Sequence, residues 1–343
     1  MKVMKHVLAF TCIGAMMMSL AGCGNSSPDN TTAAVQTEAG TTAAAQAEAG
    51  TTTAAQSEAA ASDAKVKIGF TAMNLTDPFQ ITVRDTVKEL AEAEGWEFQS
   101  GDGNSDNAKQ INLVEDMINA GITHLVLCPV SQDGILPVLQ ACKEAGVKVV
   151  NYDSAVTDRD LVECYIASDN YSAGKMDAEY LNEHYPEGGE LMIINNPKAE
   201  SVVARVKGLT ENLNENFVIV EDAAIQSSKD VLSKVDDALQ VHPDLKFIFG
   251  LNDTCGMIAL GSCQSAGRDD IVVVSVDGSP DCQASIKDGG MTATAAQSPV
   301  TLGVESFNAI KKLVAGEPVE DIAVPCFIIS KDNIDEYDIT QWH

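Results

Sequence analysis

Apolar runs of strand length alternate with segments of helical period from residue 65 onward. The run 66–70 predicts a strand, and the segment after it places apolar side chains at helical spacing: Phe79, Val83, Val87, Leu90 and Ala91. Glycines stop the helices, and further strands are predicted at 96–99, 123–127 and 147–151. Alternation at such short intervals predicts a parallel sheet covered by helices on both faces.

The same pattern starts again after Asp169. Further strands are predicted at 190–195, 217–221, 246–250, 271–276 and 291–296, with helices between them. Two similar halves predict an α/β fold of two Rossmann-like lobes with a cleft between them. Ligands of open parallel sheets lie beyond the carboxyl ends of the strands. This rule selects residues 74–80, Cys128, Asp153, Asn252 and Asp277.

The first residues have the pattern of an export signal. Lys2 and Lys5 precede a mostly apolar run, 7–20, which is too short to remain as a membrane-spanning helix. The run ends in Leu-Ala-Gly-Cys, which resembles the lipobox of bacterial lipoproteins. That resemblance implies a signal peptide at 1–22 and lipidation of Cys23. The alternative is an ordinary secretory signal in which Cys23 is incidental.

A low-complexity segment follows the signal. Residues 31–60 form a threefold ten-residue repeat of Thr, Ala, Gln and Glu with few large apolar side chains. Such a segment buries too little surface to offset its ordering entropy, so residues 23–64 are predicted to be a disordered linker behind a lipid-anchored cysteine. A short surface helix is the alternative.

Charge and cysteine content narrow the function classes. The formal net charge of −28 argues against nucleic acid and against attraction to an anionic membrane, so membrane contact is expected through the lipid only. The cysteines after residue 64 are scattered without a CxxC pair, which predicts no disulfide framework.

Catalytic and metal motifs are missing from the sequence. It contains no HExxH, GxSxG, GxGxxG or GxxxxGK[ST] segment. Asp102, Asn104 and Asp106 imitate the start of a calcium loop, but Leu113 stands where the bidentate glutamate is needed. We therefore expect a binding protein without metal or cofactor. An exported enzyme would need a nucleophile or acid/base pair in the cleft.

Several short segments carry a resemblance to a known family: residues 74–79, 152–153, 166–170, 251–253, 276–281 and 294–297. With these markers the chain resembles the ribose- and galactose-type periplasmic binding proteins from about Lys65 to Asn333. The resemblance implies three segments crossing between lobes that close over a monosaccharide. The implied lobes are 65–167 plus 298–325 and 168–297 plus 326–343.

The resemblance also implies particular contacts with a sugar. Phe79 falls where the family places a ring against the sugar's apolar face. Asp153 and Asp277 fall where carboxylates accept hydrogen bonds from hydroxyl groups. The alternative for Phe79 is a core residue of its helix, and the alternative for the two aspartates is helix capping.

Three further residues match polar positions of the family. Arg205 matches a guanidinium that bridges ligand oxygens and a carboxylate, although a surface arginine is the alternative. Asn252 and Gln297 provide both a donor and an acceptor, as hydroxyl groups require. A second group of candidate ligand contacts comprises Asn74, Asp77, Gln80, Cys128, Ser154 and Gln226.

Some of these positions depart from the family. The family often has Asn where Cys128 stands and Arg where Ser154 stands, and aromatic walls are replaced by Gln80 and Gln226. These departures weaken ribose as the ligand and leave hexoses, polyols, modified sugars and furanones open.

The sequence as a whole predicts an extracytoplasmic solute-binding lipoprotein on the outer face of the cytoplasmic membrane. It would act as a monomer that delivers a small polar ligand, a sugar or polyol, to the permease of an ABC importer. A receptor of the same fold that reports to a chemoreceptor or sensor kinase is the alternative.

Overall fold

The computed structural model describes residues 65–343, which contain two six-stranded sheets. The predicted signal peptide, Cys23 and the repeat linker lie outside the described residues. No helix within 65–343 is both long and apolar enough to cross a membrane. The seven cysteines of this region are all buried and free.

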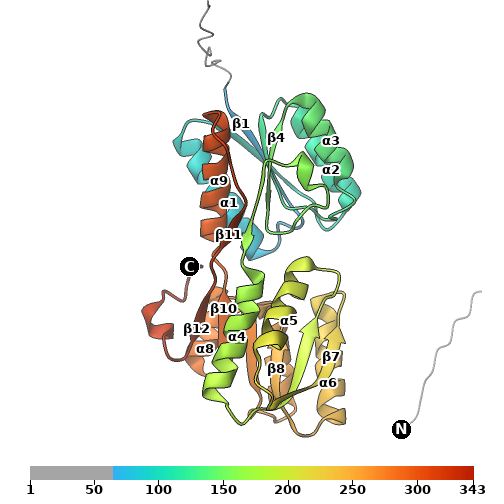
Figure 1. Cartoon of the computed structure of the whole chain (residues 1–343), viewed down its shortest axis with the longest axis vertical. Helices are drawn as coiled ribbons and strands as arrows, with labels where there is room; N and C mark the ends of the chain where they lie inside the picture. Colours follow the sequence, from blue (N-terminus) through green and yellow to red (C-terminus); the bar gives the residue numbers. More distant parts are fainter. Residues whose placement is uncertain (1–64) are drawn as a thin grey trace, which may run out of the picture. The chain divides into compact units, whose positions relative to one another are not determined.

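The first sheet has the strand order β11-β5-β4-β3-β1-β2, and all its pairs are parallel. Its strands are β1 (Lys67–Ala72), β2 (Glu97–Asp102), β3 (His124–Leu127), β4 (Lys148–Tyr152), β5 (Cys164–Ser168) and β11 (Ile322–Val324). Apolar residues of α1 (Pro78–Ala93) and α9 (Pro299–Val314) pack in one cluster with its strands. Those of α2 (Asn107–Asn119) and α3 (Leu136–Ala145) form a separate cluster, so helices cover both faces (Figure 1).

The second sheet has the order β12-β10-β9-β8-β6-β7, with only β12 antiparallel to its neighbour. Its strands are β6 (Gly189–Asn195), β7 (Phe217–Ala224), β8 (Leu245–Gly250), β9 (Val272–Asp277), β10 (Ala293–Ala296) and β12 (Phe327–Ser330). The helices are α4 (Asn170–His184), α5 (Glu200–Asn212), α6 (Val231–Val241), α7 (Asp253–Ser265) and α8 (Pro280–Asp288). Two apolar clusters again lie on the two faces, which confirms the predicted fold class.

Sequence patterns missed some of the strands. β11 and β12 are three and four residues long, too short to show a period. β7 extends to Ala224, beyond the predicted end at 221. It is an edge strand, and its polar residues hid this extension from the apolar pattern. Single-turn helices η1 (Arg159–Leu161), η2 (Ser228–Asp230) and η3 (Ile334–Glu336) occupy connecting segments.

The chain passes between the two sheets three times. It leaves the first sheet after β5 to form α4, returns after β10 to form α9, and crosses again between β11 and β12. Each set of a sheet and its helices is here called a lobe, N-terminal for the first sheet and C-terminal for the second. The carboxyl ends of strands in both lobes adjoin these crossings, as Ser168 and Ala296 illustrate.

Candidate functional site

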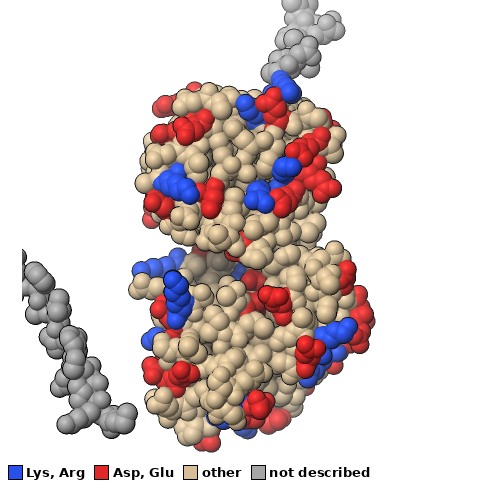
Figure 2. Space-filling model, turned by 180° about the vertical axis from the view of Figure 1, so that it is seen from behind, with Lys and Arg blue, Asp and Glu red and all other residues tan. Residues whose placement is uncertain are grey.

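A cavity of about 440 Å³ lies between the lobes. The N-terminal lobe contributes Asp77 and Pro78 at the start of α1, and the C-terminal lobe contributes Asp277 at the end of β9 and residues of α7 and α8. Figure 2 shows the hollow between the two lobes, with charged side chains visible inside it. The cavity therefore lies at the strand ends where the sequence predicts ligand contacts.

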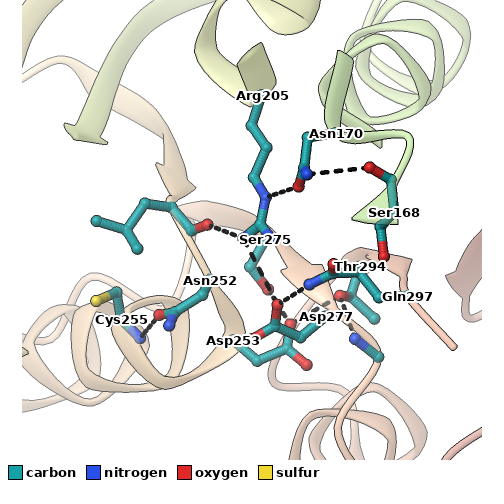
Figure 3. Close-up of polar contacts among 12 residues, drawn as sticks. Ser168, Asn170, Arg205, Asn252, Asp253, Cys255, Ser275, Asp277, Thr294 and Gln297 are labelled. Carbon is teal, nitrogen blue, oxygen red and sulfur yellow. Dashed lines mark hydrogen bonds and ion pairs between the residues drawn. The ribbon is translucent and has the colours of Figure 1, made fainter. Parts of the chain in front are cut away.

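Arg205 is the basic residue at the centre of the C-terminal part of the site. Its side chain comes from α5 and is only 6% exposed. Nε donates to Asn170 Oδ1 at 2.8 Å, and Nη1 donates to the carbonyl of Leu251 at 2.8 Å and lies 3.6 Å from Asp277 Oδ1 (Figure 3). Nη2 donates to none of the described residues. Arg205 is therefore not a free surface arginine, and one end of its guanidinium stays available.

Asp277 lies where β9 ends, in an unusual backbone conformation. Its φ is +143° and that of Gly278 is +78°, and the Gly278 N–H donates to Thr294 Oγ1 at 3.1 Å. Gln297 Nε2 donates to Asp277 Oδ1 at 2.6 Å, which leaves Oδ2 without a protein donor among the described residues. Strain of this kind persists only where surrounding contacts fix the backbone, and it is common at binding sites.

The electrostatics of Asp277 are dominated by its position away from water. Burial raises the pKa of its carboxyl, the charge of Arg205 lowers it, and the neighbouring carboxylates Asp253 and Asp77 raise it, so that the pKa lies at about 8. Gln297 also has a buried Oε1 without a hydrogen-bond partner. The Asp277 and Gln297 pair therefore presents polar atoms that the protein itself does not satisfy.

Asp253 holds the loop that carries Asp277, and the sequence analysis did not identify this role. Its Oδ2 accepts from the N–H and hydroxyl of Ser279 at 2.6 and 2.8 Å. Its Oδ1 accepts from Ser275 Oγ at 2.6 Å and Thr294 Oγ1 at 2.7 Å. With four donors, this 2% exposed carboxylate is fully satisfied and fixes the positions of three strand ends.

The N-terminal part of the site centres on Asp153. Its φ of +59° turns the side chain at the end of β4, where Oδ2 accepts from Gln80 Nε2 at 2.7 Å and from the Cys128 thiol at 3.6 Å. Gln80 Oε1 in turn accepts from the Tyr152 hydroxyl at 2.6 Å. Burial raises the pKa of Asp153, while the hydrogen bond from Gln80 and the charge of Arg205 lower it. The structure thus brings Asp153, Gln80 and Cys128 together.

Other predicted residues take part in local structure. Asn252 Oδ1 accepts from the Cys255 N–H as the cap of α7, and Asp77 caps α1 in the same way through Phe79. Asn74 Oδ1 accepts from the N–H and hydroxyl of Thr76 in a turn. The Nδ2 group of Asn252 donates to none of the described residues. Its Oδ1 and that of Asp77 cap helices, a role that the sequence analysis considered only for Asp153 and Asp277.

Three other residues that were predicted to contact the ligand have different surroundings. Gln226 is exposed, and its backbone N–H is held by Asp230. Ser154 is half-buried, and its carbonyl accepts from Asn151. Phe79 is only 7% exposed and belongs to the apolar core, but its ring meets the ring of Trp342 at a centroid distance of 5.7 Å. Trp342 also lines the cavity, and the sequence analysis missed it.

The raised pKa of Asp277 predicts a pH dependence of stability. Between the ordinary pKa of 3.8 and about 8 the folded protein binds a proton that the unfolded chain has lost. Stability from this group is therefore fully present below pH 4 and is lost as the pH rises through 8. Asp277→Asn carries no titrating proton there, so its melting temperature should rise relative to that of the unchanged protein from pH 5 to 8. Parallel melting curves for the two proteins across this range would contradict the assignment.

The chain is similar to several known proteins in sequence and in fold. Residues 68–318 match the model of the periplasmic binding protein domain family. The ribose import binding protein of Bacillus subtilis is 29% identical over 255 residues, which cover 74% of this chain and 83% of that protein. An ABC transporter solute-binding protein from Mycobacterium smegmatis with bound glycerol is 30% identical, with a TM-score of 0.73 and coverage of 79% of this chain and 96% of that one. A myo-inositol binding protein of Caulobacter, 24% identical, shares the fold with a TM-score of 0.71, covering 79% of this chain and 95% of that one.

Proposed function

Because this chain belongs to the periplasmic binding protein domain family, we propose that it binds a small polar solute between its lobes and delivers it to an ABC importer. The ligand class we infer is a monosaccharide or a related polyol. The B. subtilis relative is named a ribose import binding protein, and the M. smegmatis relative has glycerol bound. The role is binding without turnover, by a monomer that a permease contacts.

One observation carries this proposal. Asp277 lines a cavity bounded by both lobes, Arg205 and Gln297 contact Asp277, and each of the three keeps a polar atom without a protein partner among the described residues. A guanidinium, a carboxyl group and an amide together offer the donors and acceptors that vicinal hydroxyl groups need. These three groups belong to the C-terminal lobe, and Asp77 and Pro78 line the same cavity from the N-terminal lobe. A ligand that fills the cavity therefore contacts both lobes and favours the closed arrangement over an open one.

The lobe boundaries follow as part of the same proposal. We place the hinge at the three crossings near residues 168, 297 and 325, so that the lobes are 65–167 plus 298–325 and 168–297 plus 326–343. The candidate contacts lie on both sides of these crossings. Asp153 and Gln80 belong to one lobe, and Arg205 and Asp277 belong to the other.

The site of action is proposed from the sequence before residue 65. We infer that residues 1–22 are removed and that Cys23 carries lipid, which holds the protein on the outer face of the cytoplasmic membrane. Labelling cells with a radioactive fatty acid tests this directly. The protein should take up label and Cys23→Ser should not, and equal labelling of both would refute the anchor.

A thermal-shift screen of the purified protein tests the proposed ligand class. D-ribose, D-allose, myo-inositol and glycerol are the first probes, and amino acids and short peptides are the comparison set. A ligand at 100 times its Kd should stabilise the folded state by about 2.7 kcal/mol and raise the melting temperature. Stabilisation by amino acids or peptides, with none by a broad sugar and polyol panel, would contradict the proposal.

A further inference from the structure

Residues 337–343 lead from one lobe to the other across the edge of the cavity. Phe327 in β12 stacks on Tyr337, which keeps the start of this segment on the C-terminal lobe. Gln283 Nε2 in α8 donates to the carbonyl of Gln341 at 3.1 Å, which holds the backbone to the same lobe. The next residue, Trp342, packs its ring against the apolar cluster of the N-terminal lobe. The segment therefore connects the lobes outside the three crossings.

The position of the Trp342 ring is well defined. It meets Phe79 edge to face, with an interplanar angle of 82° and a centroid distance of 5.7 Å. This is a favourable geometry for aromatic pairs. The same half-buried ring lines the cavity together with Asp77 and Asp277. One part of the indole is thus anchored on the protein, and another part faces the space between the lobes.

Without Trp342 the site would have little aromatic surface for a sugar. Phe79 is 7% exposed, so nearly all its surface is used in the core. Gln80 forms hydrogen bonds with Asp153 and Tyr152, and Gln226 is exposed. Neither side chain is aromatic. A sugar or cyclic polyol has a face of C–H groups that packs well on an aromatic ring while its hydroxyls reach polar groups at the sides.

We propose that Trp342 is a ligand-contacting residue that supplies the aromatic wall of the cavity, in place of the rings that Gln80 and Gln226 lack. The inference rests on the proposed function. It narrows the ligand to a ring compound with one face rich in C–H groups, because a short linear polyol offers no such face to the indole.

Intrinsic fluorescence isolates this residue. The chain has two tryptophans, so Trp96→Phe leaves Trp342 as the only one. Trp96 packs on Phe307 in the N-terminal lobe and does not line the cavity, which makes this a neutral background. The full-length variant is titrated with D-ribose, D-allose and myo-inositol, with calorimetry and tryptophan emission recorded on the same samples. Binding should shift the emission and protect Trp342 from acrylamide quenching.

Two substitutions then separate contact from folding. Trp342→Ala should weaken binding about ten-fold or more, and Trp342→Phe should recover most of the affinity, since a smaller ring still offers a face. Calorimetric binding with unchanged emission, and equal affinity of Trp342→Ala, would overturn the role of Trp342 and leave the proposed function intact. Absence of calorimetric heat for every sugar and polyol tried would instead contradict the proposed function and this inference with it.

Discussion

Replacing Arg205 by alanine is expected to lower ligand affinity by a hundred-fold or more, which corresponds to about 3 kcal/mol. The substitution removes the guanidinium nitrogen that is free to bind the ligand. It also removes the positive charge that lies 3.6 Å from Asp277 Oδ1. The hydrogen bonds that Arg205 donates to Asn170 Oδ1 and to the carbonyl of Leu251, both 2.8 Å long, are lost as well. Calorimetry with a ligand from the thermal-shift screen measures the loss.

The same helix offers a matched control. Lys207 lies two residues along α5, with its side chain 62% exposed and its ammonium 3.9 Å from Glu211. Surface pairs of this kind contribute about 0–1 kcal/mol, so Lys207→Ala should bind as the unchanged protein does. Arg205→Lys keeps the charge but loses the planar fork and should recover only part of the affinity. Normal binding by Arg205→Ala would show that the cluster around Asp277 is not the ligand site.

The general position of the site could be predicted because it follows from topology. Carboxyl ends of parallel strands meet at one edge, so the residues after β4 and β9 had to lie near a cleft whatever their side chains. Asp153 and Asp277 were selected in this way, and the structure places both at such ends with positive φ. The resemblance to periplasmic binding proteins is confirmed by the family match. The roles of these residues as ligand contacts stay predictions.

Other features depend on contacts between distant segments and have no local pattern. Asp253 follows Asn252 and begins α7, so the sequence offers only a capping role, whereas its four donors come from three other segments. Trp342 follows the last strand, and its partner Phe79 lies near the start of the described chain. Periodicity carries no information about such pairs. Asn252 makes a local contact instead: its Oδ1 caps α7 by accepting from the Cys255 N–H, a role that the sequence analysis did not assign to it.

The junction of α4 and α5 links stability to the site. At Gly208 an added Cβ would lie 2.0 Å from the carbonyl oxygen of Tyr171, and at Gly174 it would lie 1.8 Å from the carbonyl oxygen of Arg205. Both obstacles are backbone atoms, which cannot rotate away. The two helices therefore approach as closely as glycine allows, and α4 begins directly after the first crossing while α5 carries Arg205.

Gly208→Ala should consequently destabilise the protein by about 3 kcal/mol, at the upper end of what overpacking costs, because one helix must move to admit the methyl group. The move displaces Arg205, so ligand affinity should fall as well. Urea unfolding followed by circular dichroism measures the first effect. Gly261→Ala is the matched control. Gly261 is an exposed position of α7 where the added Cβ meets no atom within 4 Å, so this substitution should stabilise the protein by about 0.5–1 kcal/mol. If Gly208→Ala unfolds at the same urea concentration as the unchanged protein, the α4–α5 contact does not limit stability, and its coupling to Arg205 is refuted.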